Sequence, residues 1–155
     1  MLFQNPTARQ INIGLAVLRT IVGAAFIAHG AQKLFVFGLG GVTGAFGQMG
    51  IPMAGIMGPL VAFVEFFGGI ALVLGLLTRL ASLGLAIDML GAIAFVHLKG
   101  GFFLPSGYEY ALSLLGSAGV LTLTGAGAYS VDALIGRGHG DTDAVIVSKK
   151  SRRAA

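Results

Sequence analysis

Residues 11–37 read INIGLAVLRTIVGAAFIAHGAQKLFVF, an apolar stretch long enough to cross a bilayer as a helix, which takes about 20 residues. Three further apolar segments follow, at about 53–77, 80–98 and 108–128. All four are rich in Leu, Ala, Gly, Val and Ile without alternation, and this favours helices over barrel strands. The sequence therefore predicts an all-α integral membrane protein, built as a four-transmembrane-helix bundle.

The composition points to the same class. The chain is 55% hydrophobic and only 10% charged, with a mean hydropathy of +0.89, whereas soluble domains carry about a quarter charged residues. Its 26 glycines follow no three-residue period, which suits membrane helices whose backbones approach closely. There is no cysteine, so thiol nucleophiles and thiolate-bound clusters are excluded.

The connections between the spans predict the domain organisation. Residues 38–52 read GLGGVTGAFGQMGIP, where Val42, Phe46 and Met49 recur at helical spacing and predict a short interfacial helix on the outer side. After the fourth span, Ser130 is expected to cap a further helical turn. We divide the chain into a short cytoplasmic segment (1–10), a membrane domain (11–136) and a polar basic cytoplasmic tail (137–155), which we expect to be disordered.

The distribution of basic residues predicts the orientation. A four-span topology leaves Lys33 and Lys99 on one side and a larger basic set on the other: Arg9, Arg79, Arg137, Lys149, Lys150, Arg152 and Arg153. The positive-inside rule then places both termini in the cytoplasm, in a multi-pass protein of the cytoplasmic (inner) membrane. The basic tail suits anionic lipid at the bilayer surface, and no nucleic acid is expected as a partner.

Several ionisable residues fall inside the apolar spans, where they are costly and are candidates for function. On the first helix, Arg19, His29 and Lys33 share one face. On the third helix, Asp88 and His97 are nine residues apart and fall on opposite sides of a straight helix, so His97 is the weaker candidate. The candidate ligand-binding residues are His29, Lys33, Arg19, Glu65, Asp88 and Glu109.

The depths of these residues predict their partners. Arg19 and Glu65 differ in depth by about 6 Å, so we expect them to form an ion pair. Lys33 is expected to meet Glu109, and Asp88 can serve either cation. The Arg19–Glu65 pair can equally be a structural clamp, and Lys33 can instead extend to the outer headgroups.

Two weak motifs are set aside. Gly38-x-Gly40 has no preceding strand and no surrounding βαβ unit, so nucleotide binding is not expected. His29 and His97 could in principle ligate a haem from two helices, but two histidines in a membrane bundle are a weak signal. We expect neither haem nor a metal site.

The order of several short motifs resembles the DoxX family of small integral membrane proteins. The matching residues are Arg19, Gly23, Phe26, His29-Gly30, Lys33-Leu34, Gly50-Ile51-Pro52, Glu65, Gly68-Gly69, Gly75-Leu76-Leu77-Thr78-Arg79, Gly125-Ala126-Gly127, Ser130 and Asp132. The likeness spans residues 11–136, with one departure at Ala126, where the family commonly has proline. It implies a compact four-helix membrane bundle. It also implies a link to redox chemistry, since the family takes its name from a subunit of quinone-linked sulfur oxidation.

The leading hypothesis is a membrane subunit of a quinone-linked oxidoreductase. His29 and Lys33 would hydrogen-bond a quinone carbonyl at the outer mouth of a polar cavity, with Arg19, Glu65 and Asp88 as its floor. Without cysteine the chain lacks an obvious electron donor, so a partner oxidoreductase subunit is expected. The alternatives are a non-catalytic scaffold for redox or stress-response enzymes and, less favoured, a small proton-coupled transporter. Glycine-rich helix faces could also support a homo-oligomer.

Overall fold

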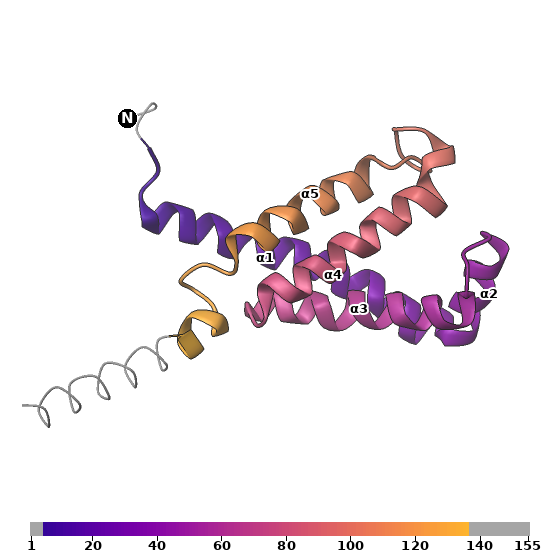
Figure 1. Cartoon of the computed structure of the whole chain (residues 1–155), viewed down its shortest axis with the longest axis horizontal. Coiled ribbons are helices and arrows are strands. Elements are labelled where there is room, and N and C mark those ends of the chain that lie inside the picture. The colour runs from indigo at the N-terminus through magenta and orange to yellow at the C-terminus, as the bar shows by residue number, and fades with distance from the viewer. Residues whose placement is uncertain (1–4, 137–155) are drawn as a thin grey trace, which may run out of the picture.

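The computed structural model describes residues 5–136, and every regular element within this range is a helix. The chain begins with α1 (Ala8–Ala31), which runs through a π-helical segment, η1 (Gln32–Phe37), into α2 (Gly38–Gln48). Helix α3 (Ala54–Leu74) then returns alongside α1 (Figure 1). The predicted helix after the first span is therefore present as α2, and it follows η1 directly in sequence, with a change of backbone direction at Gly38, whose φ is +68°.

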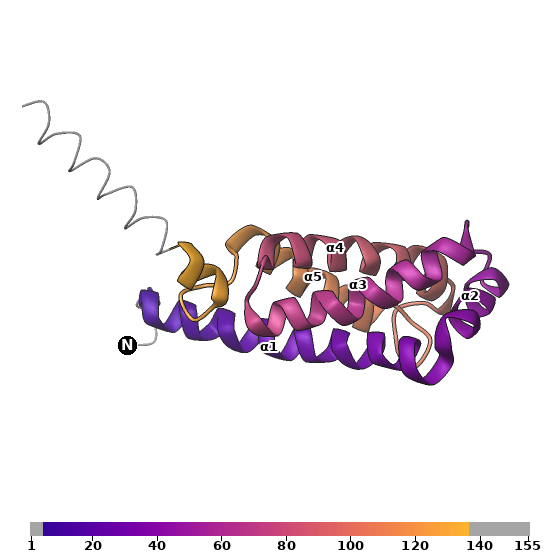
Figure 2. The ribbon, with the colours of Figure 1, turned by 90° about the horizontal axis from the view of Figure 1, so that it is seen from below.

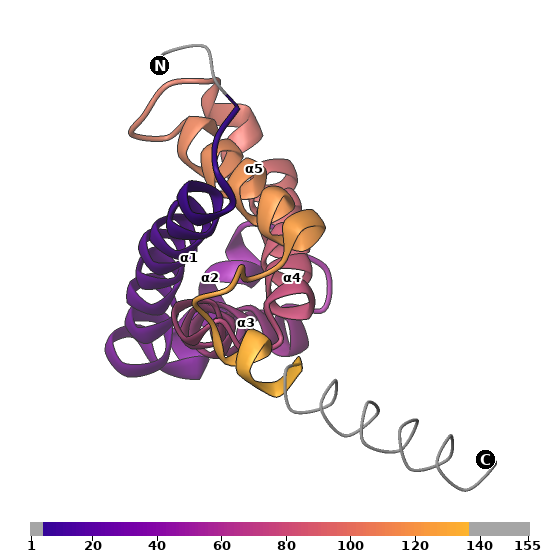
Figure 3. The ribbon, with the colours of Figure 1, turned by 90° about the vertical axis from the view of Figure 1, so that its left-hand side faces the viewer.

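The second half of the chain repeats this up-and-down course. Helix α4 (Thr78–Gly91) continues through the π-helical η2 (Ala92–His97) into the short 3-10 helix η3 (Leu98–Gly100). After a loop, α5 (Glu109–Thr124) runs back along α4. Seen end-on, the long helices α1, α3, α4 and α5 surround the axis of the bundle (Figure 3). These elements lie close to the predicted spans.

Local sequence signals account for the helix ends. Thr7 caps α1 through a capping box, in which the Gln10 N–H donates to Thr7 Oγ1 at 3.3 Å and the Thr7 N–H donates to Gln10 Oε1 at 2.8 Å. Gly75 ends α3 with a φ of +67°, a conformation that favours glycine. Ser130 accepts from the Ala133 N–H at 3.1 Å, so the predicted cap is confirmed.

Small residues bring α1 and α3 into backbone contact. A Cβ added at Gly23 would lie 2.7 Å from the Gly69 carbonyl oxygen, and one added at Gly69 would lie 2.7 Å from that of Gly23. The apolar core contains side chains from all four long helices: Val22, Phe26, Leu72, Leu85, Met89, Ala111, Leu114 and Leu121.

The two ends of the bundle differ. The start of α1, the turn between α3 and α4, and the end of α5 lie together at one end (Figure 2). Helix α2 and the loop between η3 and α5 lie at the other. The orientation relative to the cytoplasm stays a prediction, and the predicted basic tail from residue 137 lies outside the described residues.

Three helical stretches are long and apolar enough to cross a membrane: Ala8–Gln48, Ala54–Leu74 and Thr78–Gly100. The all-helical fold is therefore confirmed, together with three of the predicted spans. Helix α5 has 16 residues, just below the usual transmembrane range of about 17–25 residues. The fourth span stays a prediction.

Candidate functional site

A cavity of about 620 Å³ lies between α1, α3, α4 with η2, and α5, next to the connection that follows α2. This volume is typical of small-molecule sites, which span about 300–1,000 Å³. Helices α3 and α4 diverge from their shared turn (Figure 1). Met57 and Leu60 of α3 and Ile87 and Phe95 of α4–η2 line the cavity and are also exposed on the outer surface. The cavity is thus reachable from the side of the bundle, through an apolar surface.

The polar end of the cavity is built around an ion pair between Lys33 and Glu65. The Glu65 side chain is only 5% exposed and that of Lys33 20%, so the pair is largely shielded from solvent. Gly30, one turn before Lys33, packs directly on the backbone of Phe66, the residue after Glu65. The missing side chain at Gly30 thus sets the close approach of α1 and α3 that brings the two charges together.

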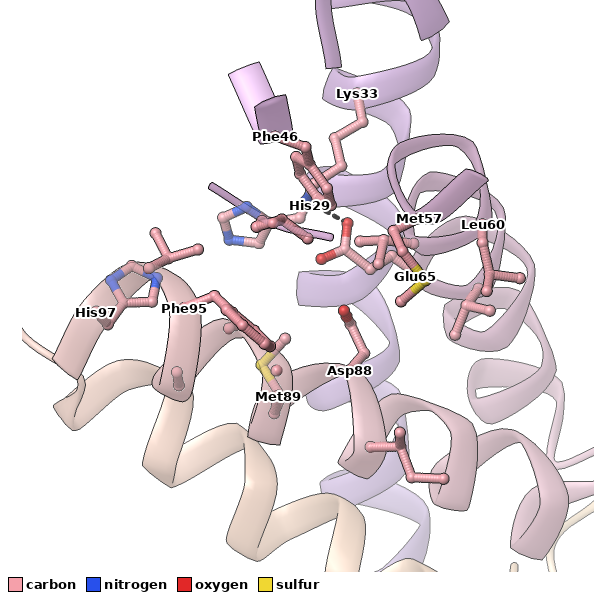
Figure 4. Close-up of a pocket in the computed structure, with 18 of the residues that line it drawn as sticks. His29, Lys33, Phe46, Met57, Leu60, Glu65, Asp88, Met89, Phe95 and His97 are labelled. Atoms are coloured by element: carbon pink, nitrogen blue, oxygen red, sulfur yellow. Dashed lines mark hydrogen bonds and ion pairs between the residues drawn. The ribbon is translucent and has the colours of Figure 1, made fainter. Parts of the chain in front are cut away.

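Asp88 of α4 completes this polar end. Its carboxyl group points toward Glu65 (Figure 4) and interacts electrostatically with both Glu65 and Lys33. Asp88 Oδ2 is buried, and no N–H group of residues 5–136 donates to it. Two carboxyl groups therefore face one ammonium group at the same site. A buried acceptor without a partner is costly, so Asp88 is a candidate for contact with a ligand.

His29 lies on the wall beside this cluster. Its ring packs against Tyr110 of α5, with centroids 6.0 Å apart and planes tilted by 50°. Within the described residues no hydrogen bond is formed by the His29 ring, which lines the cavity. A neutral imidazole offers one donor and one acceptor, so both remain available to a bound molecule.

His97 also lines the cavity, together with Asp88, so the prediction that they face opposite sides is wrong. The prediction assumed a straight α-helix, whereas residues 92–97 form the π-helix η2. Its wider turns rotate each residue by a smaller angle and bring His97 round to the cavity (Figure 4). His97 Nδ1 lies 3.3 Å from the Ser106 carbonyl oxygen, so this ring is anchored to the neighbouring loop.

Arg19 does not pair with Glu65, and that prediction is wrong. Its guanidinium group is buried at the opposite end of the bundle and donates to the carbonyl oxygens of Leu72, Val73 and Tyr129. The last carbonyl groups of α3 have lone pairs free to accept from outside the helix, and a cation at a helix C-terminus is favourable. Arg19 is therefore outside the cavity rather than part of its floor.

Glu109 does not pair with Lys33, so that prediction is wrong as well. Glu109 Oε1 accepts the Leu104 N–H at 2.9 Å and stabilises the loop before α5. Of the six predicted candidates, four therefore lie together at the cavity: His29, Lys33, Glu65 and Asp88. Their role in binding a ligand stays a prediction.

One residue that lines the cavity was missed from the sequence, and one residue of the resemblance has a structural role away from the cavity. Tyr110 lines the cavity beside His29, and its place near the outer end of the fourth apolar segment could have indicated this. Asp132 caps α4 by accepting the N–H groups of Leu77 and Thr78 at 2.7 and 2.9 Å. This contact connects two segments of the resemblance, 75–79 and 125–132, although they are distant in sequence.

The fold and the cavity define a small helical membrane protein with a polar site between its helices. The chain belongs to the DoxX family, whose sequence model, described as DoxX, matches residues 14–98. The resemblance in the motifs is thereby confirmed.

Relatives cover most of the chain. "Putative oxidoreductase CatD" of Bacillus subtilis is 32% identical over 130 residues, which are 84% of this chain and 92% of CatD. The inner membrane protein YqjF of Escherichia coli is 33% identical over 127 residues, covering 81% of this chain and 95% of YqjF. The membrane protein Rv3486 of Mycobacterium tuberculosis is 36% identical over 127 residues, 74% of this chain and 77% of Rv3486. No solved structure matches the chain at a significant level.

Proposed function

We propose that this chain is the membrane subunit of a quinone-linked oxidoreductase and binds a quinone or a similar small apolar ligand in the cavity. The observation that carries the proposal is the combination of apolar walls open to the side of the bundle with four titratable groups at one end: His29, Lys33, Glu65 and Asp88. A lipid-soluble ring with a polar edge fits such a site, because its apolar part stays against the walls while its oxygens reach the polar end. The name of the relative CatD supports an oxidoreductase role.

The contacts refine the residue roles expected from the sequence. Lys33 is engaged by Glu65, so its main role is to hold that carboxylate in place, with its remaining N–H groups available to a ligand. His29 can hydrogen-bond a ring oxygen without breaking an existing bond. Electrons would come from a partner subunit, and this chain would bind and orient the quinone.

The topology proposed with this function has α5 as a fourth span and both termini in the cytoplasm. Two features support it. The start of α1 and the end of α5 lie at the same end of the bundle (Figure 2), as an even number of crossings requires. Arg9 and Arg79 also lie toward that end, while Lys33 and Lys99 lie toward the other. This charge bias favours the inner membrane with the first end in the cytoplasm.

A binding titration on the purified chain in lipid nanodiscs tests the proposal. A decyl-substituted para-benzoquinone is added, and binding above that of empty nanodiscs is measured by calorimetry. We expect saturable binding to one site per chain. His29→Ala should weaken it about tenfold, since a hydrogen bond of about 1.4 kcal/mol is lost. Lys99→Ala is the control, because it truncates an exposed side chain outside the cavity.

The outcomes separate the alternatives. Saturable binding that weakens only in His29→Ala supports the proposal. Absence of saturable binding in the native chain contradicts it and favours the non-catalytic scaffold. Equal weakening in both variants would show that the cavity is not where the quinone binds.

A further inference from the structure

At the polar end of the cavity, the described chain supplies no N–H donor to Asp88 Oδ2, and the neighbouring side chain is another carboxyl group, that of Glu65. The buried side-chain atoms without a partner in residues 5–136 are Arg19 Nε, Thr78 Oγ1 and Asp88 Oδ2. Of their three residues, only Asp88 lines the cavity. Its carboxyl group points across the cavity toward Glu65 (Figure 4). A bound molecule can therefore supply the missing hydrogen bond.

The groups around Asp88 determine what kind of ligand atom can form this missing hydrogen bond. Lys33 of α1 is bonded to Glu65 of α3, and His29 of α1 lies farther along the wall beside Tyr110 of α5. Two carboxyl groups thus face one ammonium group, and acceptors outnumber the donors nearest to Asp88. A proton shared by the two carboxyl groups is engaged between them, and each group still has lone pairs that can accept a hydrogen bond from a ligand.

The two redox forms of a quinone differ in whether they can donate a hydrogen bond. A quinone presents two carbonyl oxygens, which only accept hydrogen bonds, whereas its hydroquinone presents two O–H groups. A carbonyl oxygen placed against Asp88 Oδ2 would leave two acceptors facing each other without a donor, and buried unpaired groups discriminate strongly between ligands. An O–H group placed there forms a bond with a carboxyl oxygen, which is among the stronger hydrogen bonds.

We infer that the cavity prefers a hydroxylated aromatic ligand, the reduced hydroquinone form, and that Asp88 is the residue that selects it by accepting the ligand O–H. This inference rests on the function proposed above and specifies the form of the ligand. Binding of the two forms is linked to the couple Q + 2e⁻ + 2H⁺ ⇌ QH₂. A tenfold preference for the hydroquinone raises the potential of the bound couple by about 30 mV, which would help a quinone in this site to accept electrons from a partner.

Three related molecules test the preference on the native chain. They are the decyl-substituted para-hydroquinone, the corresponding para-benzoquinone and the dimethyl ether of the hydroquinone, each titrated anaerobically into nanodiscs. The ether keeps the ring and both oxygens but has no O–H group. We expect the hydroquinone to bind about tenfold or more tightly than either of the others.

Substitution of Asp88 tests the residue. Asp88→Asn keeps the size of the side chain and adds an amide N–H group, which can donate to a quinone carbonyl. We expect the preference for the hydroquinone over the quinone to disappear or invert. Glu109→Gln is the matched control outside the cavity and should keep the native preference. Helical content and melting temperature of both variants check that they fold.

Each result has a distinct meaning. Quinone binding as tight as, or tighter than, hydroquinone binding on the native chain overturns this inference but leaves the proposed function standing. A hydroquinone preference that persists in folded Asp88→Asn overturns the role of Asp88. Failure of all three molecules to bind the native chain overturns the proposed function together with the inference.

Discussion

The Lys33–Glu65 pair shows how single residues hold the polar end of the cavity together. Burying two charges costs free energy, which their attraction offsets only while both are present. Glu65 is almost fully buried, so its carboxylate depends on Lys33. The pair is therefore expected to contribute little net stability, although loss of one partner should be severe.

This expectation can be measured by unfolding the detergent-solubilised protein. Lys33→Met should lower the free energy of unfolding by about 3 kcal/mol, because Glu65 is left buried without a partner. The double variant Lys33→Met/Glu65→Leu should recover most of this loss. Lys99→Met replaces an exposed lysine and should have little effect. A double variant no more stable than Lys33→Met would contradict this account.

Arg19 has a structural role at the residue scale. Its guanidinium group bonds carbonyl oxygens at the end of α3 and the carbonyl oxygen of Tyr129, which follows α5. Gly75 makes room for it, since a Cβ there would lie 2.9 Å from Arg19 Nη1. Arg19 therefore joins α1, α3 and the segment after α5 at the end of the bundle away from the cavity.

At the scale of elements, the contact between α1 and α3 depends on a glycine. A Cβ at Gly30 would lie 2.7 Å from the Phe66 Cα and closer still to the Phe66 nitrogen, and backbone atoms cannot move aside as a flexible side chain can. Any side chain at this position should push α1 away from α3 and separate Lys33 from Glu65.

Two alanine substitutions on the same helix test this contact. Gly30→Ala should destabilise the protein by about 1–3 kcal/mol through overpacking. Gly14→Ala is the matched control, because its Cβ would meet no atom within 4 Å; it should be neutral or stabilising by up to about 1 kcal/mol. Unfolding in denaturant measures both. Similar stability changes in the two variants would mean that Gly30 is not a close contact.

The π-helical segments limited how well the sequence could predict which side of a helix each residue lies on. The apolar segments placed the helices within a few residues, because period and length are properties of each segment alone. The sequence pattern did not indicate the wider turns of η2. These turns change the side of the helix on which His97 lies. Helical-wheel arguments hold only while the helix stays regular.

At the scale of the whole molecule, the two ends of the bundle have different roles. The end with Arg19 and Asp132 joins helix termini through backbone hydrogen bonds. The end near α2 holds the cavity, with its polar cluster and with exposed apolar lining residues on α3 and α4. The motifs of the DoxX resemblance fall into both groups, so only some of them bear on a ligand.

The helical membrane class and most of the ionisable residues of the cavity could be predicted from the sequence, because ionisable groups in apolar segments are few and costly. The pairing could not. The depths of residues on separate helices suggested that Arg19 pairs with Glu65. Arg19 instead donates to backbone carbonyl oxygens at the end of α3, and a sequence does not indicate which carbonyl groups are available as acceptors. The Lys33–Glu65 pair depends instead on the close approach of α1 and α3 at Gly30.

The central claim is that the cavity is the binding site for an apolar, ring-bearing ligand, and a cavity-filling substitution tests it most directly. Gly91 lines the cavity and has free space around it, while Gly116 of α5 also has free space but does not line it. Titration of the decyl-substituted para-hydroquinone into Gly91→Phe and Gly116→Phe nanodiscs compares the two. We predict binding weakened about tenfold or more in Gly91→Phe and unchanged in Gly116→Phe. Native affinity in folded Gly91→Phe, or equal loss in both variants, would contradict the claim.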